Sequence, residues 1–230
     1  MEEQRSQFVK YDFYKLDPQW RRLPSSEKEE HKQEFIAVLD ELSADVSVLP
    51  YSLVGLRGDC DFLLWKVAPD LDQLQEMGTR LWRTNLGKHL EIPYSFLSMT
   101  RHSPYVGAHR HPGQEGTTAS IRQIGRKYLF VYPFTKTHSW YQLSAEDRQS
   151  MMTDHFSVGH KYPTVKITTT YSYGLDDQEF MLGFETDSPK DFLELVIDLR
   201  GSEARPYTER DTPIFTCIAR DLAETLDSLG

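Results

Sequence analysis

Apolar and polar residues recur along the first half of the chain at spacings that predict strands and helices. Residues 8–15 alternate between apolar and polar, which is typical of a strand with one buried face. Phe35, Val38, Leu39 and Leu42 recur on one face of a helix. The pattern further predicts strands at 46–56, 61–67 and 93–100 and a helix at 70–86. The expected order is therefore β-α-β-β-α-β.

The second half of the chain repeats this order. Strands are predicted at 126–134, 164–173, 178–185 and 212–218, and helices at 144–158 and from Ser188-Pro189 onward. A short last helix containing Leu222 and Leu226 is also expected. The doubled order predicts an α+β fold of two tandem ferredoxin-like units, of the dimeric α+β barrel type. We expect an N-terminal half at 1–110, a linker at 111–125 and a C-terminal half at 126–230.

Three local signals predict where helices begin and end in this scheme. Ser26 and Glu29 have the spacing of a capping box at the start of the first helix. Gly87 follows the second predicted helix and is a candidate residue to stop it. Ser144, with Asp147 in the first turn, is expected to cap the first helix of the second half.

Composition and charge exclude several classes of protein. The 230 residues include 26 Lys and Arg against 35 Asp and Glu, a formal net charge of −9. This argues against a nucleic-acid partner or a polybasic membrane-surface protein. No apolar run approaches the roughly 18 residues of a spanning helix. With only two cysteines, no CxxC motif and a polar start, MEEQRSQF, a cytoplasmic location is the expectation.

One predicted strand combines an aromatic face with a lysine. Tyr128, Phe130, Tyr132 and Phe134 alternate on a single face, and Lys136 joins them if the strand continues past Pro133. An aromatic row on a sheet is normally core packing. A lysine at its end instead suits an anionic group at the mouth of a pocket. His155 lies on a neighbouring predicted helix, so the face could accept a flat macrocycle with this histidine as axial ligand. Taken alone, His155 is more typical of a core residue.

Other polar clusters have less specific patterns. His109 and His111, with Glu115, could bind a metal from an extended segment, but a solvated loop is the favoured interpretation. Arg200, Glu203 and Arg205 follow the last long helix; they are surface charges or a cationic rim for carboxylates. Walker, GxGxxG, HExxH, GxSxG and EF-hand motifs are absent from the sequence, which argues against the common nucleotide-binding, zinc-protease and serine-hydrolase classes.

Four stretches of the second half together resemble a known family. They are KYLFVYPFTKTHSWYQLSAEDRQSMMTDH, GHKYP, YSYGLDDQEFMLGFE and LRGSEARPYTERDTPIF. The chain resembles the chlorite dismutase-like superfamily of haem proteins, and within it the coproheme decarboxylase branch. That resemblance implies oxidative decarboxylation of iron coproporphyrin III (coproheme) to haem b, driven by hydrogen peroxide through a tyrosyl radical. It also implies a homo-oligomer, typically a pentameric ring.

The resemblance implies a role for each matching residue. His155 matches the proximal ligand of the haem iron, through its Nε2 atom. Tyr132 matches the tyrosine that becomes a radical, and Lys136 the lysine that holds a reacting propionate. The remaining matches concern the rim of the site: Arg200 for the propionates and Glu203 for tuning the proximal histidine. Arg205 is a further candidate to bind a propionate.

The distal side departs from the family pattern. Ile167 aligns where chlorite dismutases carry arginine and one decarboxylase branch carries glutamine. The absence of this cation counts against chlorite dismutation, because that chemistry uses it to hold the anion. Another decarboxylase branch takes a base from a His-x-Pro segment. His102-Ser103-Pro104 is similar, which makes His102 a candidate distal base, with His109 and His111 as rivals.

Three alternatives stay open at this level. The first is another haem oxidoreductase, either a chlorite dismutase or a peroxidase-like enzyme. The second is a non-catalytic haem-binding carrier or sensor. The third is a haem-free α+β barrel protein with only a structural resemblance.

Overall fold

The computed structural model describes residues 6–105 and 121–230, which form two compact units. The N-terminal unit comprises residues 6–97 and 216–230, and the C-terminal unit comprises residues 98–105 and 121–215. This division differs from the predicted halves, since the last fifteen residues belong to the N-terminal unit. Most of the predicted linker at 111–125 lies outside the described residues.

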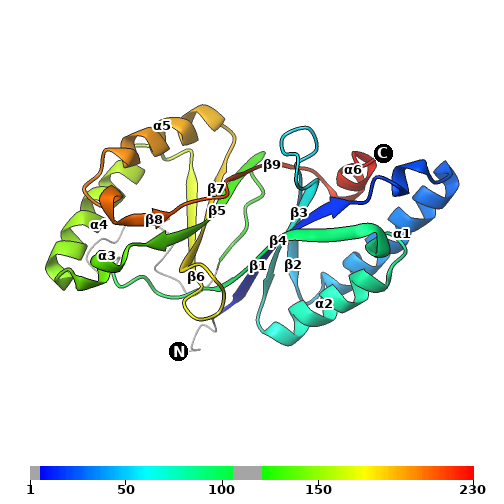
Figure 1. The fold of residues 1–230 in the computed structure, drawn as a ribbon, viewed down its shortest axis with the longest axis horizontal. Helices are drawn as coiled ribbons and strands as arrows, with labels where there is room; N and C mark the ends of the chain where they lie inside the picture. The colour runs from blue at the N-terminus through cyan, green and yellow to red at the C-terminus, as the bar shows by residue number, and fades with distance from the viewer. Residues whose placement is uncertain (1–5, 106–120) are drawn as a thin grey trace. The chain divides into compact units, whose positions relative to one another are not determined.

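The N-terminal unit is an antiparallel sheet with two long helices packed against it (Figure 1). Its strands follow the order β4-β1-β3-β2-β9. Phe35 and Leu39 of α1 meet Leu74 and Met77 of α2 in one core on the sheet. The elements are β1 (Phe8–Leu16), η1 (Trp20–Arg22), α1 (Ser25–Leu42), β2 (Ser47–Ser52), β3 (Phe62–Ala68), α2 (Leu71–Arg83), η2 (Gly87–His89), β4 (Leu90–Met99), β9 (Phe215–Ala219) and α6 (Leu222–Asp227).

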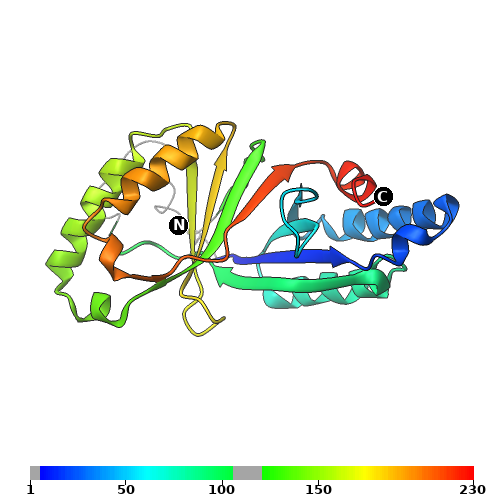
Figure 2. The ribbon, with the colours of Figure 1, turned by 45° about the horizontal axis from the view of Figure 1, so that its top comes forward.

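The C-terminal unit is built in the same way. Strands β6, β7, β5 and β8 pair in that order, all antiparallel, and Met99 at the end of β4 pairs with Tyr171 of β6. Helices α4 and α5 run side by side along the sheet (Figure 2). The elements are β5 (Tyr128–Lys136), α3 (His138–Gln142), α4 (Ala145–Gly159), β6 (Lys166–Tyr171), β7 (Phe180–Thr186), α5 (Pro189–Arg200), η4 (Arg205–Tyr207) and β8 (Thr208–Arg210).

The internal repeat extends to single residues. In each unit the first strand leads into a short helical turn that carries a buried tryptophan, Trp20 or Trp140. Counting from these tryptophans, Phe35 occupies the position of His155, and Asp12 occupies that of Tyr132. The predicted α+β class with two tandem units is confirmed, and the two units carry different side chains at these matched positions.

Two of the predicted helix ends are wrong. Helix α1 begins at Ser25 after Pro24, without a side-chain cap, so Ser26 already lies inside the helix and forms no capping box with Glu29. Helix α2 ends before Gly87, at Arg83. The Thr84 hydroxyl donates to the Leu81 carbonyl and accepts from the Gly87 N–H at 2.9 Å, which closes the turn.

The predicted cap at Ser144 is confirmed, and the helix predicted to begin at Ser188-Pro189 also begins with a side-chain cap. The Ser144 hydroxyl oxygen accepts a hydrogen bond from the Asp147 N–H, and the Ser188 oxygen accepts one from the Asp191 N–H. The pattern predicted neither α3 nor β8, because each is too short to show a period. Within residues 6–105 and 121–230, no helix is long and apolar enough to cross a membrane.

Candidate functional site

Strand β5 supplies the aromatic face of the candidate site. The strand continues past Pro133 to Lys136, as required for the lysine to join that face. The Phe130 ring stacks on Phe192 of α5 with ring centres 4.0 Å apart, and the Tyr132 ring stacks on Phe184 of β7 at 5.5 Å. The face is therefore packed against α5 and β7, which fixes the position of the Tyr132 ring.

Tyr132 is 8% exposed, and its phenol is held in the protonated form. Burial raises the pKa of Tyr132 well above its usual value, and the charge of Asp211 adds to this. Arg200 and Arg205 act in the opposite direction. These three charged side chains from the α5–β8 region therefore lie within electrostatic reach of the phenol.

Lys136 is a buried cation beside an aromatic ring. Its side-chain nitrogen lies over the Trp140 ring, and its backbone N–H donates to Glu179 Oε2 at 2.7 Å. Burial lowers the pKa of Lys136 to about 8; the carboxylate of Glu179 opposes this shift and the cation of Arg205 adds to it. A lysine with so low a pKa is poised to gain from an incoming anion.

His155 lies on α4, facing the same region. Its Nδ1 atom is buried and has no hydrogen-bond partner among the described residues. Burial lowers the pKa of His155 to about 4, and the charge of Lys136 acts in the same direction. The imidazole is therefore neutral at pH 7, which is the form that binds metals.

Arg200 and Arg205 meet on one carboxylate. Arg200 Nη1 donates to Asp211 Oδ2 at 2.5 Å, and Arg205 Nη1 donates to the same oxygen at 2.7 Å. Burial opposes ionisation of Asp211, but the two arginines outweigh it and the pKa of Asp211 lies below its usual value. The cluster of these three side chains keeps one net positive charge.

Glu203 is the rim residue that the structure does not bring to its predicted partner. The Glu203 side chain is exposed after α5, while Nδ1 of His155 has no partner among the described residues. No hydrogen bond between these two side chains is present. The tuning role that the resemblance implies for Glu203 therefore has no contact to support it.

The distal candidates lie on or near β6. Ile167 is half-buried and packs against the core that includes Tyr132 and Phe184. His102 is exposed in the segment after β4. The neighbouring Arg101 guanidinium lies 5.9 Å from the ring centre of Tyr171, on the same strand as Ile167. His109, His111 and Glu115 lie outside the described residues.

Three residues of this region were not predicted from the sequence: Asp211, Trp140 and Glu179. Trp140 could have been found, because its match to Trp20 in the repeat marks a corresponding place in the two units. The role of Asp211 depends on β8, which brings the end of β5 next to residues 208–210. No periodic pattern reveals a three-residue strand.

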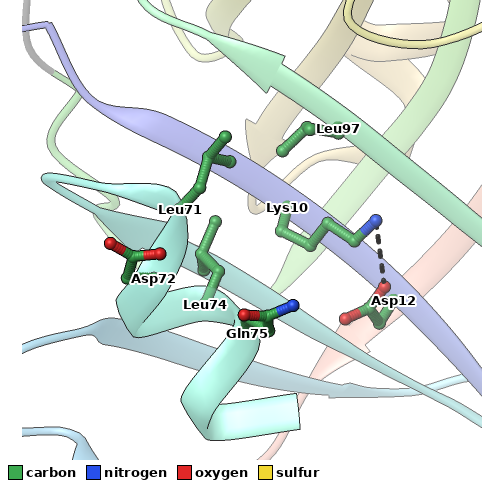
Figure 3. A pocket seen from close by; sticks show the side chains of 7 residues that line it. All are labelled: Lys10, Asp12, Leu71, Asp72, Leu74, Gln75 and Leu97. Atoms are coloured by element: carbon green, nitrogen blue, oxygen red, sulfur yellow. Dashed lines mark ion pairs between the residues drawn. The ribbon is translucent and has the colours of Figure 1, made fainter.

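A cavity of about 340 Å³ lies elsewhere, in the N-terminal unit (Figure 3). Figure 3 shows the Lys10 ammonium turned toward Asp12, with 3.8 Å between nitrogen and oxygen. None of the predicted site residues lines it; the lining residues are Lys10, Asp12, Leu71, Asp72, Leu74, Gln75 and Leu97. Across the described parts of both units, no group of three His, Cys, Asp or Glu side chains could hold a metal.

A neutral imidazole with a buried Nδ1 atom, in the same region as aromatic side chains and several cations, fits a site for an iron porphyrin with acidic side arms. The comparisons with known proteins agree with this class. The sequence profile of the family described as chlorite dismutase matches residues 28–220. The chain belongs to the chlorite dismutase family.

Two curated relatives carry a more specific name. The coproheme decarboxylase of Mycolicibacterium smegmatis is 31% identical over 174 residues, which cover 72% of this chain and 70% of that protein. The coproheme decarboxylase of Staphylococcus carnosus is 30% identical over 205 residues, covering 83% of this chain and 82% of that protein. Both similarities extend over most of the chain.

Solved structures share the whole fold. A mutant chlorite dismutase from Candidatus Nitrospira defluvii superposes with a TM-score of 0.87 at 26% identity, covering 96% of this chain and 94% of that one. A haem-binding protein from Thermus thermophilus gives a TM-score of 0.84 at 26% identity, covering 97% of this chain and 94% of that one.

The residues present fit an iron porphyrin. A buried polar atom without a partner costs free energy, and His155 Nδ1 is such an atom among the described residues. Lys136 likewise carries a charge that burial disfavours. An iron bound at the other ring nitrogen, Nε2, would use the neutral form of this imidazole and leave Nδ1 free to donate a hydrogen bond. A carboxylate near the ammonium would offset the cost of burying the charge of Lys136.

Proposed function

We propose that this protein is an enzyme that converts iron coproporphyrin III to haem b by oxidative decarboxylation with hydrogen peroxide. In each of two rounds, one propionate and one peroxide would give a vinyl group, carbon dioxide and two molecules of water. Two hydrogen atoms leave each propionate with its carboxyl carbon, and peroxide is the oxidant that accepts them. The coproheme decarboxylases at 30% and 31% identity support this choice within the family.

The observation that carries the proposal is the joint placement of His155, Lys136 and Tyr132. The ammonium of Lys136 is close enough to His155 for its charge to disfavour protonation of the imidazole. The ammonium lies 5.4 Å from the ring centre of Phe134, two residues after Tyr132 on the same strand. An iron ligand, a carboxylate-binding cation and an oxidisable phenol are the three groups that this reaction requires.

Each side chain would have a distinct task. When bound, the iron porphyrin supplies the redox chemistry with peroxide. His155 binds the iron, and Lys136 holds the reacting propionate beside Tyr132. Tyr132 loses its phenolic hydrogen and then takes one from the propionate, a transfer that needs near-contact geometry. Arg200 and Arg205 bind further propionates.

The distal candidates are Ile167, half-buried on β6, and His102, exposed after β4. Ile167 would present an apolar surface on the distal face, which leaves room for peroxide without a fixed cation. His102 is proposed as the base that takes the first proton from peroxide, and Glu203 as an indirect influence on His155. The homopentamer and the cytoplasmic location remain predictions of the resemblance and of the composition.

Replacement of the phenol tests the proposal. We expect Tyr132→Phe to bind iron coproporphyrin III as the wild type does, because Phe retains the ring that stacks on Phe184. The variant should release no carbon dioxide after peroxide is added. Mass spectrometry of the wild-type reaction should show two successive losses of the mass of formic acid. Decarboxylation by Tyr132→Phe at the wild-type rate would refute the role of Tyr132.

Chlorite decomposition is the competing activity, and the structural similarity to a chlorite dismutase favours it. Strand β6 carries Ile167 and has no arginine between Lys166 and Tyr171. Sustained oxygen release from chlorite over many turnovers, with coproheme left intact by peroxide, would replace the proposed function by this one.

A further inference from the structure

Asp211 holds both cations that are proposed to receive substrate carboxylates. Arg200 and Arg205 come from the end of α5 and from η4, and each donates through Nη1 to the same oxygen, Asp211 Oδ2. The Asp211 side chain is 16% exposed, against 40% for Arg200 and 35% for Arg205. The carboxylate therefore lies behind the two guanidinium groups, and these groups reach the solvent.

The surroundings make this cluster part of the candidate site. Asp211 directly follows β8, whose Thr208 pairs with Lys136 of β5. Its charge also reaches the Tyr132 phenol, as do those of both arginines. Three cations, Lys136, Arg200 and Arg205, thus share one region, and Asp211 binds two of them. The other carboxylate of this region, Glu179, accepts from the backbone of Lys136.

We propose that Asp211 is an internal competitor for the substrate's carboxylates, and so sets how strongly the site binds a porphyrin with acidic side arms. In the ligand-free protein Asp211 neutralises one of the two arginine charges and orients both groups. An arriving propionate must share or replace this ion pair. Asp211 is therefore a specificity-determining and positioning residue rather than a catalytic one, and this inference rests on the proposed function.

Competition between Asp211 and the substrate predicts how affinity changes when Asp211 is replaced. Asp211→Asn removes the internal anion and retains an oxygen that can still accept from one arginine. The net charge of the cluster then rises from +1 to +2. Affinity for a ligand that carries carboxylates should increase, and it should depend more steeply on salt concentration because more charge is exposed to screening. A residue needed only to preorganise the arginines would have the opposite effect when it is replaced.

The test is a titration of the purified full-length protein with iron coproporphyrin III, followed by the Soret band at several salt concentrations. We expect Asp211→Asn to bind about two- to fivefold more tightly, the change expected from releasing a partly exposed ion pair. Asp211→Glu, which retains the charge, should bind as the wild type does. Asp177→Asn removes the same charge from an exposed turn of this unit and should change nothing.

Each outcome has one meaning. Tighter binding and a steeper salt dependence in Asp211→Asn alone support the inference. Equal or weaker binding by a folded Asp211→Asn overturns it while leaving the proposed function intact. Absence of binding by the wild type overturns both. If Asp211→Asn does not fold, Asp211→Ser is titrated instead, with the same expected direction and the same meaning for each result.

Discussion

The side-chain nitrogen of Lys136 lies 4.0 Å from the centre of the Trp140 ring. The ring face attracts the cation, while burial disfavours its charge. The balance leaves the pKa of Lys136 at about 8, with burial as the largest cause. Trp140 therefore holds the ammonium in place without supplying a counter-ion, so the ammonium can pair with a carboxylate of a bound molecule.

Binding of iron coproporphyrin III should weaken as the pH rises above about 8. Below that value Lys136 is protonated and attracts a propionate; above it the charge is lost, and affinity should fall by up to about tenfold per pH unit. Soret titrations between about pH 6.5 and 9.5 measure this. Lys136→Arg keeps its charge throughout this range and should show no such fall. A wild-type profile as flat as that of Lys136→Arg would contradict the role of Lys136.

Removal of the imidazole should abolish iron ligation. We expect His155→Ala to lose the absorption bands of an imidazole-bound iron porphyrin, and millimolar imidazole to restore them in part. His160→Ala, at the exposed end of the same helix, is the matched control and should keep the wild-type spectrum. An unchanged Soret band in His155→Ala would exclude His155 as the ligand.

The N-terminal unit contains a buried ion pair whose loss should destabilise the fold. Lys66 is 1% exposed, and its ammonium lies 2.8 Å from Asp12 Oδ2. Lys66→Met leaves Asp12 buried without its main counter-ion and should cost about 3–5 kcal/mol in the free energy of unfolding. Lys10→Met, which removes a half-buried lysine 3.8 Å from Asp12, should cost less than about 1 kcal/mol.

The same pair predicts a pH dependence and a double-mutant test. Burial would raise the pKa of Asp12, but Lys66 outweighs it and the pKa is lowered. The stabilisation is therefore present above the unfolded carboxyl pKa of about 3.9 and is lost as the pH falls through the folded value. The double variant Asp12→Leu with Lys66→Met should be more stable than Lys66→Met alone in urea unfolding. Equal stability would show that the pair does not couple.

Two glycines of the N-terminal unit should respond oppositely to alanine. A Cβ on Gly87 would lie 2.0 Å from the Leu81 carbonyl oxygen, so Gly87→Ala should destabilise the protein by about 1–3 kcal/mol. A Cβ on Gly78, inside α2, meets nothing within 4 Å. Gly78→Ala should therefore stabilise by about 0.5–1 kcal/mol. Thermal unfolding of both variants measures these changes in stability. If both variants were stabilised, or both destabilised, the prediction would be contradicted.

Long periodic segments were predictable from the sequence, and contacts between distant segments were not. The alternation from Tyr128 to Lys136 predicted both a strand and the face that it presents, because one buried face imposes a period of two. Ser144 predicted its helix start because a cap is a local hydrogen bond. Ser26 failed as a cap because Pro24 allows the helix to begin at Ser25.

The candidate site was predictable to the extent that its residues lie on regular elements. Periodicity placed His155 inside the predicted helix at 144–158, and it placed Lys136 after the strand at 126–134 on condition that the strand continues past Pro133, as it does. Asp211 could not be linked to Arg200 and Arg205, because the sequence does not show how the chain turns back through η4 and β8. The distal side depends on residues after β4, where a segment without periodicity gives no positional information.

The two repeats share backbone elements but differ in the side chains at matched positions. Both units follow their first strand with a buried tryptophan and then a long helix, yet one carries Phe35 and Asp12 where the other carries His155 and Tyr132. The same backbone architecture thus holds a buried ion pair between Asp12 and Lys66 in one copy, and a neutral imidazole and a buried phenol in the other. The N-terminal unit therefore serves as an internal comparison. Features that both units share, such as the buried tryptophan after the first strand, do not account for the chemistry proposed for the C-terminal unit.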